Sequence, residues 1–296
     1  MLRAVPARRR VTLVVSGLTC LVVLGLAAVW VVVTPGPDGA DVDEAMSLSR
    51  SQRAQQNLAD DAEISARLHG ARPLTWVFVG DSITHGVGTD GWRSFVEHFA
   101  ERVRTELERV DDVVINTGIS GNQTEDVLAG FDARVRRFRP DVVVVMLGTN
   151  DSVEGPAGRD VFRQHVERIV ERVRGIGALP LLQVPPPVDT SAAVERDDLG
   201  SYANAVREVA EARQVVLVDH RAHWLAAGDG EAPPQWLADD IHPNARGHLE
   251  MARTIFQRLH IFDPGSPTGG AHWADPEVRP RAGQPQPPAG DLAGHG

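Results

Sequence analysis

The sequence Leu-Thr-Trp-Val-Phe-Val-Gly-Asp-Ser-Ile-Thr-His-Gly occupies residues 74–86 and joins an apolar run to a polar turn. Its first part, 74–79, has the aromatic and β-branched content of a buried strand. Gly80 allows a tight turn after that strand, and the turn places the hydroxyl of Ser82 where a strand meets a helix. Ser82 is therefore a candidate nucleophile at a strand end, although Asp81 and Ser82 taken alone are more typical of residues that cap the following helix.

Apolar runs of strand length recur along the chain and alternate with longer segments whose apolar residues have helical spacing. Further strands are expected at residues 113–116, 142–147, 179–184 and 215–218. Helices are expected at residues 92–110, 125–138, 161–173, 199–212 and 244–259. Strands that are almost continuously apolar are typical of a parallel sheet covered on both faces. The pattern predicts an α/β domain with a five-stranded parallel sheet.

Polar residues follow the second and third predicted strands. Residues 116–122 are Asn-Thr-Gly-Ile-Ser-Gly-Asn, and residues 148–151 are Gly-Thr-Asn-Asp. In open sheets of this kind, ligands bind outside the carboxyl ends of the strands. A glycine amide and an asparagine carboxamide are neutral donors suited to stabilise an oxyanion. Gly121 and Asn150 are therefore candidate donors, although each residue taken singly is more typical of a turn.

The segment 239–244, Asp-Asp-Ile-His-Pro-Asn, lies directly before the last predicted helix. Pro243 favours an extended conformation at His242, and Asn244 can cap the helix. Asp239 can reach one imidazole nitrogen of His242 while the other nitrogen faces the serine, as in the orientation of a base for acyl transfer. Taken alone, the segment is more typical of a surface histidine beside solvated carboxylates.

Together, these blocks resemble the SGNH hydrolase superfamily, also called the GDSL lipases and esterases. The matching residues, in the order of the family's blocks, are Gly80, Asp81 and Ser82; Gly121, with Gly118 as a rival; Gly148, Asn150 and Asp151; and Asp239 and His242. The resemblance covers about residues 74–260. Four blocks in the family's order, each at a strand end or a helix start, are more specific than any one motif.

The resemblance implies a flavodoxin-like, three-layer α/β/α fold and ester hydrolysis through an acyl-enzyme, without a metal or organic cofactor. It implies Ser82 as nucleophile, His242 as its base and Asp239 as the residue that orients the imidazole. The amides of Ser82 and Gly121 and the side chain of Asn150 would hold the oxyanion.

Residues 11–33 contain no charged side chain and are long enough as a helix to cross the hydrocarbon layer of roughly 30 Å. Arg3, Arg8, Arg9 and Arg10 precede this segment, whereas the first basic residue after it is Arg50. The positive-inside rule then predicts a cytoplasmic N-terminus at residues 1–10, a transmembrane anchor at 11–33 and an extracytoplasmic remainder. The alternative is a cleaved signal peptide followed by secretion, although the apolar region of a signal peptide is usually only about 7–15 residues long.

Composition divides the rest of the chain. Residues 34–73 are expected to form a helical or flexible spacer, and residues 74–262 the catalytic domain. Residues 263–296 are crowded with Pro and Gly and predict a disordered tail.

The net charge of −10 argues against nucleic acid as a partner. The predicted partners are an ester substrate and, through the N-terminal helix, a cell membrane.

The expected substrate is a short acyl ester, for example an acetyl group on a glycan, because no long apolar insertion is present to cover a fatty chain. The alternatives within the family are a lipase or lysophospholipase and a thioesterase. Two others are an acyltransferase acting on a sugar hydroxyl and a non-catalytic glycan-binding domain. Trp92, Trp224 and Trp236 are candidates to line such a site, although helix packing is the more typical use of each.

Overall fold

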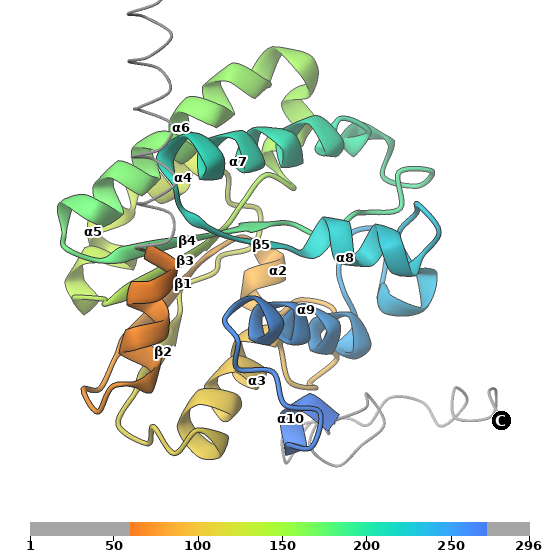
Figure 1. Cartoon of the computed structure of the whole chain (residues 1–296). Coiled ribbons are helices and arrows are strands. Elements are labelled where there is room, and N and C mark those ends of the chain that lie inside the picture. The colour runs from red at the N-terminus through yellow and green to blue at the C-terminus, as the bar shows by residue number, and fades with distance from the viewer. Residues whose placement is uncertain (1–59, 271–296) are drawn as a thin grey trace, which may run out of the picture. The chain divides into compact units, whose positions relative to one another are not determined.

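The computed structural model describes residues 60–270 of the chain (Figure 1). The predicted cytoplasmic N-terminus 1–10, the predicted anchor 11–33, most of the predicted spacer and most of the predicted tail lie outside the described residues. Within residues 60–270, no helix combines the length and the apolar composition that a membrane span requires.

The sheet has five parallel strands in the order β2-β1-β3-β4-β5. The strands are β1 (Thr75–Gly80), β2 (Val113–Asn116), β3 (Val142–Met146), β4 (Leu179–Val184) and β5 (Val216–Asp219). This is the strand order of flavodoxin-like sheets, in which the direction of winding reverses between β1 and β3. The predicted α/β class and the five-stranded parallel sheet are confirmed, and each strand limit lies within one residue of its prediction.

Helices cover both faces of the sheet and give three layers (Figure 1). One face packs against α3 (Phe95–Glu101), α8 (His220–Ala227) and α9 (Ala245–Arg258). The other face packs against α4 (Thr124–Ala129), α5 (Phe131–Arg134), α6 (Gly155–Gly175) and α7 (Leu199–Arg213). The short helices are α2 (Ser82–His85), η1 (Arg102–Glu106), η2 (Arg136–Phe138), η3 (Asp151–Glu154), η4 (Val194–Arg196), η5 (Pro234–Trp236) and α10 (Pro267–Gly270).

The alternation of side chains along each strand divides the core into these two layers. Trp76 and Phe78 of β1 are buried against the α3 and α9 side, whereas Val77 and Val79 are buried against the α6 and α7 side. Successive residues of a strand point to opposite faces, so a strand that is apolar at every position must be covered on both. The sheet is thereby fixed between two helical layers, and its loops are the parts left free to build a site.

Two predicted helices differ from the structure. The segment 92–110 becomes helical only at Phe95, because Ser94 and Glu97 form a reciprocal capping box there. The segment 125–138 is broken at Gly130, which separates α4 from α5.

Both flanks of the predicted catalytic domain contribute to packing. Residues 60–69 are helical, and Ile64 and Leu68 of this helix are buried in the core beside α9 residues. At the other end, Thr268 of α10 is buried and donates through its hydroxyl to Glu106 at 2.6 Å. These contacts lie within the ranges 34–73 and 263–296, so the folded unit includes residues on both sides of 74–262.

Candidate active site

Ser82 is the first residue of α2, and only Asp81 separates it from the end of β1. Asp81 caps this helix by accepting a hydrogen bond from the Ile83 amide at 3.0 Å. A side chain at Gly80 would lie 2.5 Å from the Met146 carbonyl oxygen, so the turn requires glycine. The capping alternative therefore applies to Asp81, and the Ser82 hydroxyl is left for another partner.

That partner is His242. Its Nε2 lies 2.9 Å from Ser82 Oγ, and its Nδ1 lies 2.8 Å from Asp239 Oδ2. Burial opposes ionisation of Asp239, but hydrogen bonds from the His242 amide and ring and from the Ile241 amide hold the pKa of Asp239 below its ordinary value. The three predicted residues thus form one chain of hydrogen bonds from carboxylate to hydroxyl, although 157 residues separate Ser82 from Asp239 in the sequence.

The backbone on both sides of His242 is fixed. The His242 carbonyl accepts from the Ala238 amide at 2.8 Å, and Asn244 caps α9 by accepting from the Gly247 amide at 3.0 Å. Asn244 also donates to the Leu237 carbonyl at 3.1 Å. Since the loop is tied to itself and to α9, the imidazole is presented at a fixed corner.

The two candidate glycines after β2 differ in what they do. Gly118 donates its amide to Asn116 Oδ1 at 2.9 Å, and a side chain there would lie 2.5 Å from the His85 amide nitrogen. Gly121 has a φ of +81°, which favours glycine, and a side chain there would meet no atom within 4 Å. Gly118 is therefore required for close packing, whereas Gly121 holds a turn in an open region.

Asn150 lies in the loop after β3, directly before η3, and both its side chain and its main chain form hydrogen bonds. Its Nδ2 donates to the Asn122 carbonyl at 3.0 Å, and its own carbonyl accepts from Gln123 Nε2 at 3.1 Å. Asn122 directly follows Gly121, so the loops that carry the two candidate donors are joined to each other.

Two buried carboxyl groups lie beneath these loops. Burial, with a smaller effect of the neighbouring Asp151 carboxylate, raises the pKa of Asp81 to about 6, against hydrogen bonds from the Ile83 and Thr84 amides. Burial also raises the pKa of Asp151, whose Oδ1 accepts from the Thr124 amide at 2.9 Å and from its hydroxyl at 2.6 Å. The sequence placed both residues in the family's blocks, but only the fold shows that they are buried near each other.

Three further histidines are buried behind the site. Burial lowers the pKa of His98 and of His220 to about 3 and that of His248 to about 4. His248 stacks on Phe95 with 5.9 Å between ring centroids, and its Nδ1 accepts from the Phe95 amide at 3.3 Å. These rings are neutral packing elements near pH 7, and His242 is the histidine that faces Ser82.

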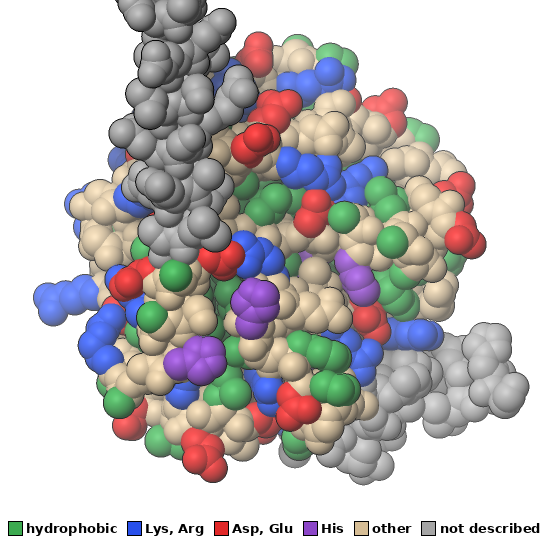
Figure 2. All heavy atoms as spheres, viewed as in Figure 1, with side chains coloured by type: hydrophobic (Ala, Val, Ile, Leu, Met, Phe, Trp, Pro, Cys, Tyr) green, Lys and Arg blue, Asp and Glu red, His purple; other side chains and the backbone are tan. Residues whose placement is uncertain are grey.

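The three candidate tryptophans take packing positions. Trp224 and Trp236 meet edge to face at 5.1 Å in the core, and Trp92 packs against Leu249. Figure 2 shows acidic and basic side chains interspersed over the viewed face, so charge does not mark a binding surface there.

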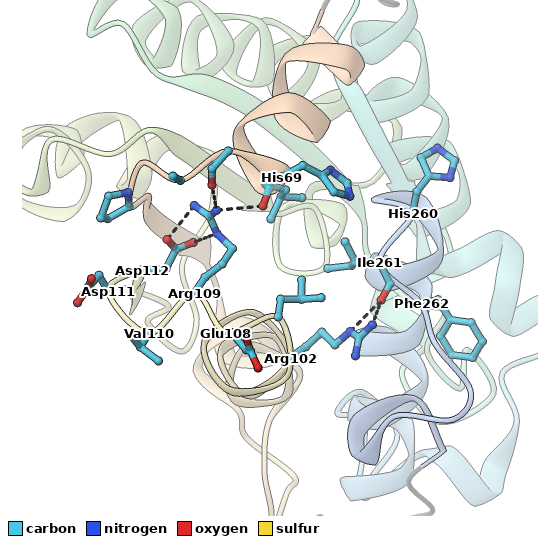
Figure 3. A pocket seen from close by; sticks show the side chains of 15 residues that line it. His69, Arg102, Glu108, Arg109, Val110, Asp111, Asp112, His260, Ile261 and Phe262 are labelled. Carbon is cyan, nitrogen blue, oxygen red and sulfur yellow. Dashed lines mark hydrogen bonds and ion pairs between the residues drawn. The ribbon is translucent and has the colours of Figure 1, made fainter.

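The cavity in Figure 3, of about 600 Å³, lies at the opposite edge of the sheet, where the amino ends of the strands lie. Its lining includes Pro73 and residues 107–112, which precede β1 and β2, together with Arg102 and residues 260–262. None of Ser82, His242 and Asp239 lines it.

The model of the GDSL-like lipase/acylhydrolase family matches residues 78–249, more than half of the chain. An acetylxylan esterase of Geobacillus stearothermophilus is 24% identical, with 62% of this chain and 92% of the relative covered. The uncharacterized lipoprotein YqeF of Bacillus subtilis is 28% identical over 62% of this chain and 86% of its own length. An uncharacterized protein of Mycoplasma pneumoniae is 43% identical over 77 residues, which are only 9% of that protein.

Among solved structures, the acetylxylan esterase Axe2 of Geobacillus stearothermophilus superposes with a TM-score of 0.55 at 22% identity, covering 63% of this chain and 94% of Axe2. This likeness concerns the fold. Together with the family match, it confirms the resemblance that the motif blocks predicted.

Proposed function

The chain belongs to the GDSL-like lipase/acylhydrolase family and is an ester hydrolase, and we propose that it removes short acyl groups from a polar alcohol by means of Ser82, His242 and Asp239. The observation that carries the proposal is the continuous chain of hydrogen bonds from Asp239 through His242 to Ser82, with separations of 2.8 Å and 2.9 Å.

Each of the three residues has a separate task in this mechanism. Ser82 Oγ attacks the ester carbonyl while His242 Nε2 takes the hydroxyl proton. The tetrahedral intermediate collapses to an acyl-serine as His242 returns the proton to the leaving alcohol. Water then attacks the acyl-serine, with His242 again taking and returning the proton. Asp239 holds the imidazole in the required tautomer and stabilises its protonated form.

The oxyanion is held by the amides of Ser82 and Gly121 and by the side chain of Asn150. The open turn at Gly121 supports this choice, because the Gly118 amide is already bonded to Asn116. The bond from Asn150 to the Asn122 carbonyl uses only one of the two amide hydrogens. The other hydrogen is available to an oxyanion.

The preference for short acyl groups is supported by the loops at this edge of the sheet. The longest connections, residues 185–198 and 228–244, contain Pro and Asp and no apolar run of lid length. A fatty chain would have little wall to bury against, and each buried methylene is worth about 0.8 kcal/mol. The acetylxylan esterases among the relatives favour a glycan acetyl ester as the substrate.

The test is kcat/KM for nitrophenyl esters of two to twelve acyl carbons, beside acetate release from acetylated glycans. We expect a flat or falling profile beyond about four carbons, together with acetate release. A maximum at eight carbons or longer without acetate release would indicate a lipase or lysophospholipase. Acetyl transfer to an added sugar would indicate a transferase, and no turnover of any activated ester would indicate a binding domain.

The proposed location is the cell membrane, with residues 11–33 as a single-pass anchor and the catalytic domain outside the cytoplasm. The charge asymmetry around this segment supports the orientation, and a relative named as a lipoprotein supports attachment to the envelope. Protease added to spheroplasts should release an active fragment cut upstream of residue 60. Reporter fusions after Gly70 that are active only in the cytoplasm would exclude this orientation.

A further inference from the structure

Arg134 of α5 is a buried arginine that bonds to the end of β1 and, at two points, to the loop after β2. Its Nη2 donates to the Gly80 carbonyl at 3.0 Å and to the Thr117 carbonyl at 2.7 Å. Its Nη1 donates to Asn122 Oδ1. The side chain is 9% exposed and forms no ion pair with a carboxylate among residues 60–270.

Two of the three acceptors, Gly80 and Asn122, lie beside groups assigned to the reaction. Gly80 comes two residues before Ser82, and Asn122 comes directly after Gly121. The Asn122 carbonyl in turn accepts from Asn150 Nδ2 at 3.0 Å. The Arg134 guanidinium therefore contacts the chain two residues from Ser82 and one residue from Gly121. It is linked to Asn150 through Asn122, whose carbonyl accepts from Asn150.

Stabilisation of the fold does not by itself explain why the Arg134 guanidinium is buried. Burial lowers the pKa of Arg134, against the opposing charge of Asp126, and Nε of the guanidinium has no hydrogen-bond partner among the described residues. Burying a cation against neutral carbonyls costs desolvation that the hydrogen bonds only partly offset. The rigid fork of donors is, however, suited to hold several acceptors at fixed separations.

We propose that Arg134 is a positioning residue that sets the distance between the Ser82 nucleophile and the oxyanion donors Gly121 and Asn150. This inference rests on the proposed function, since it assumes that those groups hold the oxyanion. Arg134 itself touches no substrate atom. It acts through Gly80, Thr117 and Asn122.

The main variant is Arg134→Lys, which keeps the charge but cannot bond all three acceptors at once. A displacement of about 1 Å in such a site can cost about 10²-fold in rate. We expect kcat for a short nitrophenyl ester to fall by about 10-fold to 10²-fold, with KM changed less than about 3-fold. Asn122→Ala removes one acceptor with less risk to folding, and it should lower kcat by about 10-fold, again with little change in KM.

Arg102→Lys is the matched control. Arg102 is also a buried arginine, and its Nε and Nη2 both bond to the Ile261 carbonyl, at 2.8 Å and 2.6 Å. It lies at the other edge of the sheet, beside the cavity of Figure 3. This variant should lose stability while its kcat stays within about 2-fold of the parent chain.

A double-mutant cycle with Asn150→Ala tests the coupling. If Arg134 acts through the oxyanion donors, the combined loss in kcat is smaller than the product of the two single losses. Three results would overturn the positioning role. They are a combined loss in kcat equal to the product of the single losses, a change confined to KM in Asn122→Ala, and equal effects of Arg134→Lys and Arg102→Lys on kcat. If Asn150→Ala itself leaves kcat unchanged, the proposed oxyanion site fails instead, whatever Arg134→Lys does.

Discussion

The two edges of the sheet both carry buried or half-buried charge, but they use it differently. At the amino-terminal edge, Asp112 accepts from the Leu74 amide at 2.9 Å and from Trp76 Nε1 at 3.2 Å, and it pairs with Arg109. At the carboxyl-terminal edge, Asp239 holds His242, which faces the hydroxyl of Ser82.

The difference shows that a hollow does not identify a reactive site. The cavity lies at the amino-terminal edge, where the carboxylate is fully engaged with structural donors (Figure 3). At the other edge the carboxylate of Asp239 is half exposed and bonds to an imidazole that contacts Ser82, the proposed nucleophile. Changes at the carboxyl-terminal edge should therefore remove activity without unfolding the domain, and changes at the amino-terminal edge should do the reverse.

The largest expected effect comes from Ser82→Ala, because the hydroxyl forms the covalent bond to the acyl group. Esterase kcat should fall by about 10⁴-fold or more. The midpoint of urea unfolding should stay close to that of the parent chain, since the hydroxyl contributes little packing. Near-normal turnover by a folded variant would remove Ser82 from its role.

Asp239→Asn should have the next largest effect. It replaces the carboxylate that orients His242 and should lower kcat by about 10²-fold to 10⁴-fold. Asp240→Asn is the matched control, because the bond that Asp240 makes to the Asp189 amide uses its main-chain carbonyl. A larger loss in Asp240→Asn would show that the orienting acid has been assigned to the wrong residue.

Asn150→Ala should lower kcat by about 10²-fold to 10³-fold while changing KM less, since an oxyanion donor acts chiefly in the transition state. Steady-state kinetics on a short nitrophenyl ester would measure both constants. A defect confined to KM would make Asn150 a substrate-binding residue instead.

The sequence predicted those features that depend on local pattern. Strands β1 and β3 are almost continuously apolar, which fixed their limits, and the spacing of Asp239, His242 and Asn244 fixed the corner before α9. The contact between Ser82 and His242 was predicted only by the resemblance to the family. No local pattern relates two residues so far apart in the sequence.

Features that depend on distant partners were missed. Arg134 has the appearance of a solvated arginine on an amphipathic helix, and nothing nearby in the sequence indicates that Gly80 and Thr117 are its acceptors. Ile64 and Leu68 lie in a polar stretch, and only the assembled core shows that they are buried. The helix α8 was also missed, because its eight residues are too few to show helical spacing.

At the amino-terminal edge, Asp112→Ala should reduce stability and leave catalysis intact. Removing one partner of a buried ion pair costs about 3–5 kcal/mol, because the other charge is left buried. Urea unfolding would measure the loss, and kcat should stay within about 2-fold wherever the variant is folded. Asp111→Ala, which alters the exposed neighbouring carboxylate, should change neither quantity. A large fall in kcat in folded Asp112→Ala would contradict the separation of the two edges.

The smallest expected effect is a dependence of stability on pH that arises behind the carboxyl-terminal edge. His98, His220 and His248 lie among the first four residues of α3, α8 and α9, the helices that begin at this edge. Burial lowers the pKa of each ring to about 3 or 4 from its ordinary value of 6.5. The unfolded chain therefore takes up protons at a pH where the folded chain does not. Stability is present above pH 6.5 and is lost as the pH falls below it.

Asp81 and Asp151 oppose this loss, because burial raises the pKa of both carboxyl groups and the folded chain keeps protons that the unfolded chain releases. Three histidines against two carboxyl groups leave a net loss of stability between pH 7 and pH 5.5. Urea unfolding across this range measures the slope, and His98→Leu, which removes one of the three rings, should reduce it by more than one third. A free energy of unfolding that stays constant from pH 7 to pH 5.5 would mean that water or a hydrogen-bond partner reaches the rings. In that case the two edges would differ in catalysis alone.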